Sequence, residues 1–158
     1  MKQPFVGRVL TVLVLGSLVA CGQPGATQPL RPETFARQVS DGSVVLYWNC
    51  TRPASGILRV EGVVSNAFVP APIRDVDLTL YGVDAPGRDV SRVTGSTASY
   101  QIPPMVTSPF RLDLPLAGGD VQFDLRYQYQ GSFGGGASDD GGASAITSNL
   151  ARDVCRGL

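Results

Sequence analysis

The chain contains no histidine, and Lys2 is its single lysine. Histidine is the commonest general base and a common metal ligand, so its absence removes the usual route to both kinds of site. A serine nucleophile would also need a neighbouring base. Paired carboxylates such as Asp75 and Asp77 share one strand face, but solubility alone places acids on the wet side of a strand. The sequence therefore predicts a non-catalytic protein with no metal ion and no cofactor.

An excess of positive charge is also absent, since the 158 residues include 13 Lys and Arg and 13 Asp and Glu. Binding to nucleic acid would need a basic patch for the phosphates, so nucleic acid is not an expected partner. Without its first 20 residues the chain keeps 138, of which 11 are basic and 13 acidic. That length suits one domain with its own core.

The apolar run from Val9 to Ala20 is too short to cross a membrane. A helix that rises about 1.5 Å per residue needs roughly 20 apolar residues to span the hydrocarbon core. The run follows the basic residues Lys2 and Arg8 and ends in small residues, the order found in secretory signal peptides. We therefore expect residues 1–20 to be a signal peptide.

A cysteine follows this run, at the position where a secreted protein ordinarily has a small residue. Leu18-Val19-Ala20-Cys21 resembles the lipobox of bacterial lipoproteins, whose cysteine receives a diacylglycerol and then usually a further acyl chain. The resemblance implies a lipidated Cys21 and a protein of the cell envelope tethered to a membrane, because two or three acyl chains anchor stably. In such lipoproteins, Asp after the cysteine favours retention in the inner membrane. Gly22 stands there in this chain, so the resemblance implies an anchor in the outer membrane if the host has two membranes. The alternative is a secreted protein in which Cys21 is a plain thiol.

The chain has three cysteines, and an odd number leaves one cysteine of an exported protein without a disulfide partner. Lipidation of Cys21 leaves Cys50 and Cys155, the even pair expected of an exported chain. We predict a disulfide between these two residues that joins the first strand of the domain to its last. Two buried free thiols are the alternative.

The segment after Cys21 reads GQPGATQPLRP and shows no apolar periodicity. Its prolines and glycines are typical of a coil-like tether. Glu33 to Val39 can form one or two helical turns, since Pro32 stands where a helix starts. We expect residues 21–42 to contain the lipidated cysteine and the tether, and residues 43–158 to form the domain.

From Ser43 onward, apolar and polar residues alternate with a period of two, the pattern of strands with one buried face. In the clearest stretch Val121, Phe123, Leu125, Tyr127 and Tyr129 share one face. About seven strands are expected, over 43–49, 58–64, 75–80, 89–101, 110–116, 121–130 and 143–154. Their number and spacing predict an all-β fold, an antiparallel sandwich of the immunoglobulin or fibronectin type III kind.

Two of these strands are joined by Ala117-Gly118-Gly119-Asp120, a connection of hairpin length. We predict that 110–116 and 121–130 pair with each other antiparallel, because parallel neighbours need a much longer crossover.

A family resemblance runs from about Leu58 to Tyr129. The motifs that resemble the FxLYD domain and its DUF3426 relatives are VEGVVSN at 60–66, IRDV at 73–76, LTLYG at 78–82, IPP at 102–104 and PFRL at 109–112. Those relatives are small immunoglobulin-like or fibronectin-like sandwiches of bacterial envelope proteins. Leu78 stands where the family has Phe, Gly82 where it has Asp, and Met105 where it has Gly. Because such motifs are mostly core and turn positions, the resemblance implies fold and not activity.

Apolar residues in expected loops suggest a partner-binding tip. Phe68, Val69 and Phe133 either form such a tip or fold back to close the ends of the core.

Two further stretches each have two interpretations. Tyr47 and Trp48, beside Cys50, form either a ligand platform or a packed core. The glycine-rich stretch 131–142 contains Asp139-Asp140, which reads either as a calcium loop or as a long connection.

Two functions remain. The first is a non-catalytic envelope module that binds another protein through its loops or an exposed strand edge, as an accessory subunit or scaffold. The second is a carrier or sensor of a small apolar ligand, which would need a cavity of about 300 Å³ or more. The large inward aromatic residues Phe110, Phe123, Tyr127 and Tyr129 indicate a filled interior and favour the first.

Overall fold

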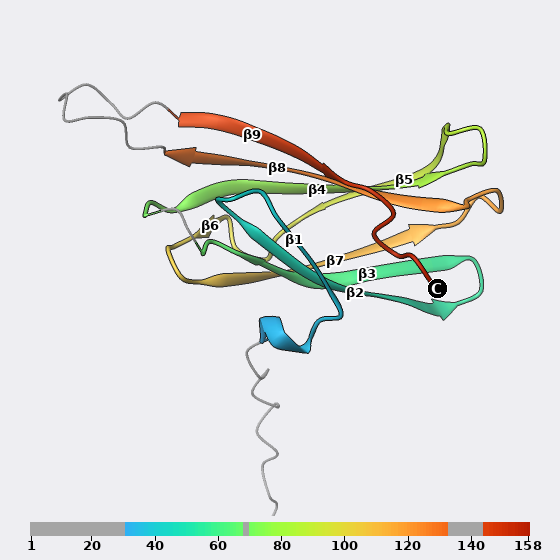
Figure 1. The fold of residues 1–158 in the computed structure, drawn as a ribbon, viewed down its shortest axis with the longest axis horizontal. Coiled ribbons are helices and arrows are strands. Elements are labelled where there is room, and N and C mark those ends of the chain that lie inside the picture. The colour runs from blue at the N-terminus through green and yellow to red at the C-terminus, as the bar shows by residue number, and fades with distance from the viewer. Residues whose placement is uncertain (1–30, 68–69, 133–143) are drawn as a thin grey trace, which may run out of the picture.

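The computed structural model describes residues 31–67, 70–132 and 144–158, which form two antiparallel sheets packed face to face (Figure 1). Sheet A has the order β1-β2-β3-β7, with β1 (Arg37–Ser40), β2 (Val45–Ala54), β3 (Ile57–Ser65) and β7 (Thr107–Pro115). Sheet B has the order β5-β4-β8-β9, with β4 (Ile73–Val83), β5 (Asp89–Ser96), β8 (Gln122–Ser132) and β9 (Ser144–Ala151), and β6 (Gln101–Ile102) also pairs with β4. The predicted β-sandwich is confirmed.

The interior lies between the inward faces of the two sheets. Side chains of both sheets are fully buried there, among them Leu46, Leu58, Val60, Leu78, Leu80, Leu112, Leu114, Leu125, Tyr127 and Tyr129. Burying each large apolar side chain contributes about 1.5–3 kcal/mol, so this interior is the main source of stability. The inward positions expected of Phe110 and Phe123 are confirmed, since both are buried.

The alternation predicted for β8 is confirmed over most of its length. Phe123, Leu125, Tyr127 and Tyr129 are buried, whereas Arg126 and Gln128 are exposed. Val121 was expected on the buried face but is 66% exposed. It precedes the strand, in the turn that leads into β8, where its N–H donates to the Val83 carbonyl oxygen at 2.8 Å.

The predicted hairpin between β7 and β8 is wrong. β7 pairs with β3 at the edge of sheet A, and β8 lies between β4 and β9 in sheet B. The connection crosses between the sheets: the Leu116 N–H bonds to Gly56 in sheet A, and the Val121 N–H bonds to Val83 in sheet B. The four residues 117–120 are long enough for a hairpin within one sheet and also for a crossing between the sheets, since stacked sheets lie only about 10 Å apart.

The sheet also begins before residue 43. A single 3-10 turn, η1 (Pro32–Thr34), is followed by β1, in which Val39 lies opposite Leu46 of β2. The helical turns expected up to Val39 are therefore wrong beyond Thr34, and Arg37–Ser40 is a strand inside the stretch expected to be tether. Burial of Val39 against the core explains the extended conformation. Within the described ranges, no helix combines the length and the apolarity needed to cross a membrane.

Candidate functional site

One flank of the sandwich is open between the edge strands of the two sheets. Sheet A ends at β1 and sheet B ends at β9, and a cleft of about 590 Å³ lies between them. Residues 36–39 form one wall, residues 150–153 form the other, and Trp48 and Val154 also line the space. We call it the β1–β9 cleft.

Polar contacts cross this flank on either side of the cleft. The Arg37 guanidinium donates to the carbonyl oxygen of Arg156 at 2.5 Å. On the other side of the cleft, Oδ2 of Asp41 accepts hydrogen bonds from the Asn149 amide at 2.7 Å and from the Tyr129 hydroxyl at 3.0 Å. Burial, and then the nearby Asp41 carboxylate, raise the pKa of the Tyr127 phenol, which therefore stays neutral. Asp41 thus holds the β1–β2 turn against sheet B.

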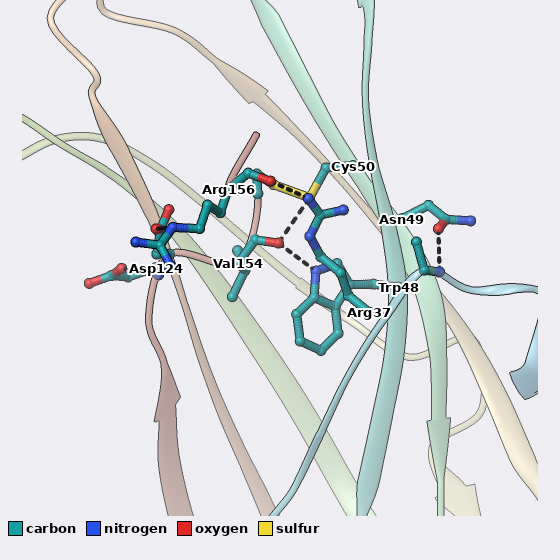
Figure 2. The surroundings of a disulfide bond; sticks show 10 residues. Arg37, Trp48, Asn49, Cys50, Asp124, Val154 and Arg156 are labelled. Atoms are coloured by element: carbon teal, nitrogen blue, oxygen red, sulfur yellow. Dashed lines mark hydrogen bonds and ion pairs between the residues drawn. A yellow bond between two sulfur atoms is a disulfide. The ribbon is translucent and has the colours of Figure 1, made fainter. Parts of the chain in front are cut away.

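Trp48 lies at the bottom of the cleft and belongs to the core. Its side chain is 4% exposed, and its indole N–H donates to the carbonyl oxygen of Val154 at 2.9 Å (Figure 2). Gly62 of β3 lies directly opposite Trp48 of β2. A Cβ atom at Gly62 would overlap the Tyr47 carbonyl oxygen and crowd Trp48, so glycine is required there. The ligand-platform interpretation of Trp48 is therefore wrong, and the alternative of core packing beside a disulfide holds.

The predicted disulfide between Cys50 and Cys155 is present, but it starts on the second strand and not on the first, because β1 precedes β2. Cys50 of β2 is bonded to Cys155, which follows β9, with their Cα atoms 5.7 Å apart and a separation of 105 positions in sequence (Figure 2). The bond joins the two sheets, because β2 belongs to sheet A and the segment after β9 lies against sheet B. That segment is also held by the Val154 N–H, which donates to Phe123 at 2.7 Å, and by the Asp153 N–H, which donates to Asp124 at 2.9 Å.

The free edge of β9 is the least protected sheet edge in the described part of the chain. Natural sheet edges are commonly protected by charged side chains or proline. β1 carries Arg37, β5 carries Asp89 and Arg92, and β7 carries two prolines and two charged residues. β9 reads SAITSNLA, with no charge and no proline, and it pairs with β8 alone.

Two apolar side chains stand on this edge strand and point away from the core. Ile146 is 71% exposed and Leu150 is 44% exposed. They lie opposite Gln130 and Arg126 of β8, so both belong to the outer face of sheet B. β9 therefore combines unpaired backbone groups with exposed apolar side chains, the combination that another strand can cover.

A second, more apolar groove lies on sheet A and extends past its edge strand β7 to the end of β5 in sheet B. Its volume is about 430 Å³, and we call it the Phe35 groove. It is lined by Phe35, Glu61, Gly62, Ser96, Ala98, Pro109, Phe110 and Arg111. Because it opens on the surface, it is not a cavity between the sheets.

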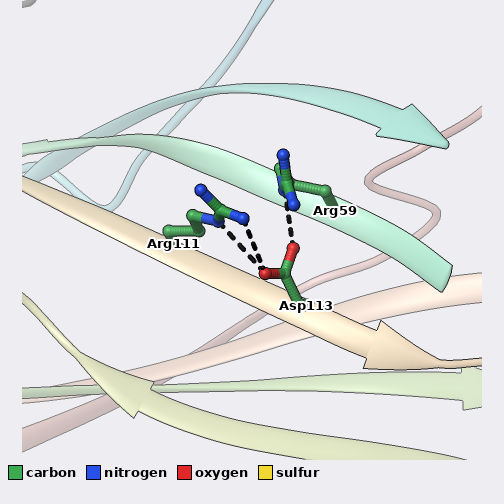
Figure 3. Close-up of polar contacts among 3 residues, drawn as sticks. All are labelled: Arg59, Arg111 and Asp113. Atoms are coloured by element: carbon green, nitrogen blue, oxygen red, sulfur yellow. Dashed lines mark hydrogen bonds and ion pairs between the residues drawn. The ribbon is translucent and has the colours of Figure 1, made fainter. Parts of the chain in front are cut away.

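A charged cluster occupies the same outer face of sheet A (Figure 3). The carboxylate of Asp113 accepts from Arg59 Nε at 2.6 Å and from Arg111 Nη2 at 3.0 Å. The hydrogen bond from Arg59 is the largest cause that lowers the pKa of Asp113. Since a general acid or base works best with a pKa near the working pH, Asp113 is suited to an ion pair and not to proton transfer.

Several residues singled out from the sequence lie outside the described residues, namely Cys21, Phe68, Val69, Phe133 and the Asp139-Asp140 pair. The described loop that bonds to Asn66 carries the exposed apolar residues Met105 and Val106. Met105 is 80% exposed with φ at 63°, and its N–H donates to the Asn66 carbonyl oxygen at 2.7 Å. Among the described residues, no group of three or more potential metal ligands comes together.

Sequence reasoning found the disulfide but missed the β1–β9 cleft and the β9 edge. The one available signal was the uncharged run from Ser144 to Ala151, whose position at an edge depends on strand order. No family model matches the chain, and a comparison with curated proteins gives no match either. The resemblances to the lipobox and to the FxLYD domain therefore stay predictions, and the interpretation of the site rests on its geometry.

Proposed function

We propose that this chain is a non-catalytic, lipid-anchored module of the bacterial cell envelope that binds a further protein chain by strand addition at β9. The observation that carries the proposal is the open edge of β9, eight residues long, without charge or proline. Alternate residues of an edge strand turn their N–H and C=O groups away from the neighbouring strand. These groups are the docking points for an added strand.

The surroundings of β9 offer contacts on both faces of an added strand. Side chains on its inner face would lie toward the β1–β9 cleft, above Trp48 and Val154. Side chains on its outer face would cover Ile146 and Leu150. Backbone hydrogen bonds then supply affinity, and these two sets of contacts supply specificity.

The anchor is proposed from the sequence, and the position of η1 agrees with it. Phe35, which follows η1, lies beside the outward-facing Glu61 and Arg111 of sheet A. The chain therefore enters the domain on the side of sheet A that faces away from sheet B (Figure 1). The entry of the chain at η1 therefore does not cover the edge of β9, which belongs to sheet B.

Intact-mass measurement tests the anchor. We expect a mature species that begins at Cys21 and carries added acyl mass, and release of the Cys21→Ser variant from the membrane fraction. A mature chain that starts at Cys21 without acyl mass would refute the anchor.

Paired variants test strand addition. Intact acylated protein serves as bait in solubilised envelopes, and the double variant I146K/L150K places two charges on the β9 edge, where they oppose pairing. We expect the bound protein to be lost from this variant and retained by V90K/T94K, which places two lysines at the same spacing on exposed positions of β5, the opposite edge of sheet B. Equal recovery with both variants would contradict the proposal.

The Phe35 groove supports a second candidate function, the carriage of a small apolar ligand. Its volume of about 430 Å³ exceeds the roughly 300 Å³ at which ligand pockets begin. The buried aromatic residues between the sheets make the interior an unfavourable site for such a ligand. Binding of an apolar fluorescent probe that Ala98→Trp abolishes would support this function, and binding unaffected by Ala98→Trp would exclude the groove.

A further inference from the structure

We propose that the strand added to β9 is β9 of a second copy of this chain, paired antiparallel about a two-fold axis at Ser148. This inference rests on the proposed strand addition and names its partner. Three features of the described residues favour it: the order of side chains along β9, the charges on the strand edges, and the position of η1.

The order of side chains makes β9 complementary to itself. In an antiparallel pair centred on Ser148, Ile146 lies opposite Leu150 of the second copy, and Leu150 lies opposite Ile146. Directly opposed residues have Cβ atoms about 4.5–5.5 Å apart, close enough for apolar side chains to touch. Both side chains are exposed on the outer face of sheet B. Pairing therefore covers the two apolar side chains of each copy with those of the other.

The charges on the strand edges permit this pairing and limit it to two copies. Like charges opposite one another destabilise a strand pair, and β9 carries no charge to repel its copy. Pairing uses the β9 edges of both copies and leaves the joined sheet ending in β5 at each side. β5 carries Asp89 and Arg92, and next to it Ala98 donates to Pro109 of β7 at 2.8 Å. A symmetric interface that consumes its own edges closes as a dimer.

The position of η1 suits two anchors in one membrane. The two-fold axis of an antiparallel strand pair runs perpendicular to the sheet, so the outer faces of both copies of sheet B lie on one side of the joined sheet. Both copies of sheet A then lie on the other side, and both chains enter through η1 from that side (Figure 1). The first described residues of both copies would therefore lie on the same side of the joined sheet, an arrangement compatible with two anchors in one membrane.

Cysteine cross-linking in intact envelopes tests the register of the full-length protein. Cys50 and Cys155 are bonded to each other and Cys21 is expected to be acylated, so an introduced cysteine is the free thiol. We expect Ser148→Cys to give a disulfide-linked dimer, at least about tenfold more than Thr94→Cys on β5, because the dimer holds the two thiols side by side.

The neighbouring positions make the test specific for this register. Two copies of Ile146→Cys would lie about 14 Å apart, at roughly 3.4 Å per residue, and should not link. Ile146→Cys expressed together with Leu150→Cys should link, because these positions oppose each other across the axis.

Each other outcome overturns a defined part of the proposal. If Ser148→Cys links to a different protein, the partner is not a second copy of this chain, while strand addition at β9 holds. If Ser148→Cys gives no linked species and I146K/L150K retains its bound protein, both proposals fail. If Thr94→Cys links as much as Ser148→Cys, the dimer comes from random collision and the two-fold pairing is refuted.

Discussion

The indole Nε1 of Trp48 donates a 2.9 Å hydrogen bond to the carbonyl oxygen of Val154, and so joins residues 106 positions apart in sequence. Trp48 comes from sheet A, and Val154 follows the last strand of sheet B. The bond lies beside the Cys50–Cys155 disulfide (Figure 2). At this end of the β1–β9 cleft the two sheets are therefore fastened together by the disulfide, by the Trp48 hydrogen bond and by the Arg37 contact to Arg156.

Replacement of Trp48 by Phe should destabilise the fold by about 1–3 kcal/mol, because it removes a buried donor and leaves the Val154 carbonyl without it. Urea unfolding of the purified protein measures the change in free energy of unfolding. Tyr47→Phe, on the opposite face of the same strand, is the control and should stay within about 0.5 kcal/mol. If the two substitutions lower the free energy of unfolding equally, the hydrogen bond from Trp48 to Val154 does not stabilise the fold.

Reduction of the disulfide should lower the free energy of unfolding by about 2–4 kcal/mol, because the bond closes a loop of 105 residues in the unfolded chain. Thermal unfolding with and without reductant measures the effect. In the unfolded but unreduced chain, neither Cys50 nor Cys155 should react with a thiol alkylator. Labelling of both cysteines before reduction would rule the bond out.

Alanine at Asp124 should cost more stability than alanine at Arg126, although both residues stand on the outer face of β8. Asp124 is half-buried and accepts from Gln122 at 2.7 Å and from the Asp153 N–H at 2.9 Å, so Asp124→Ala should cost about 1–2 kcal/mol.

Arg126 is exposed and lies over the Tyr81 ring at 5.3 Å, a contact that contributes at most about 1 kcal/mol at the surface. Urea unfolding of both variants under the same conditions measures the difference. Equal costs would show that the contact to Asp153 does not hold the last segment.

Acid should weaken the ion cluster around Asp113. Its pKa is lowered, chiefly by the hydrogen bond from Arg59, so the folded state favours the carboxylate more than the unfolded chain does. The stability that follows is complete above the unfolded pKa of about 3.9 and is lost as the pH falls through the lower folded pKa.

Unfolding experiments at a series of pH values test this direction. Asp113→Asn should be less stable than the parent protein at neutral pH, and the difference should shrink in acid. A difference that stays constant between pH 7 and pH 2 would refute the contribution of the ion pair.

The sequence by itself determined which side of the clearly alternating strands faces the core. Phe123, Leu125, Tyr127 and Tyr129 are buried as their alternation predicts, because successive side chains of a strand point to opposite faces wherever the strand lies. The pairing of Cys50 with Cys155 was predicted because the resemblance of residues 18–21 to a lipobox set Cys21 aside and left an even pair. Neither inference needs the order of the strands.

Only the tertiary structure decided which strands are neighbours. The connection 117–120 is short enough for a hairpin, yet it joins β7 of sheet A to β8 of sheet B. The strand β1 and the open edge of β9 were also hidden from the sequence, because an edge is defined by the absence of a neighbour. Strand order follows from how two sheets bury their apolar faces together, and alternation is the same for every order that buries those faces. The candidate site therefore arises from long-range packing, whereas the faces of the strands that surround it arise from local sequence.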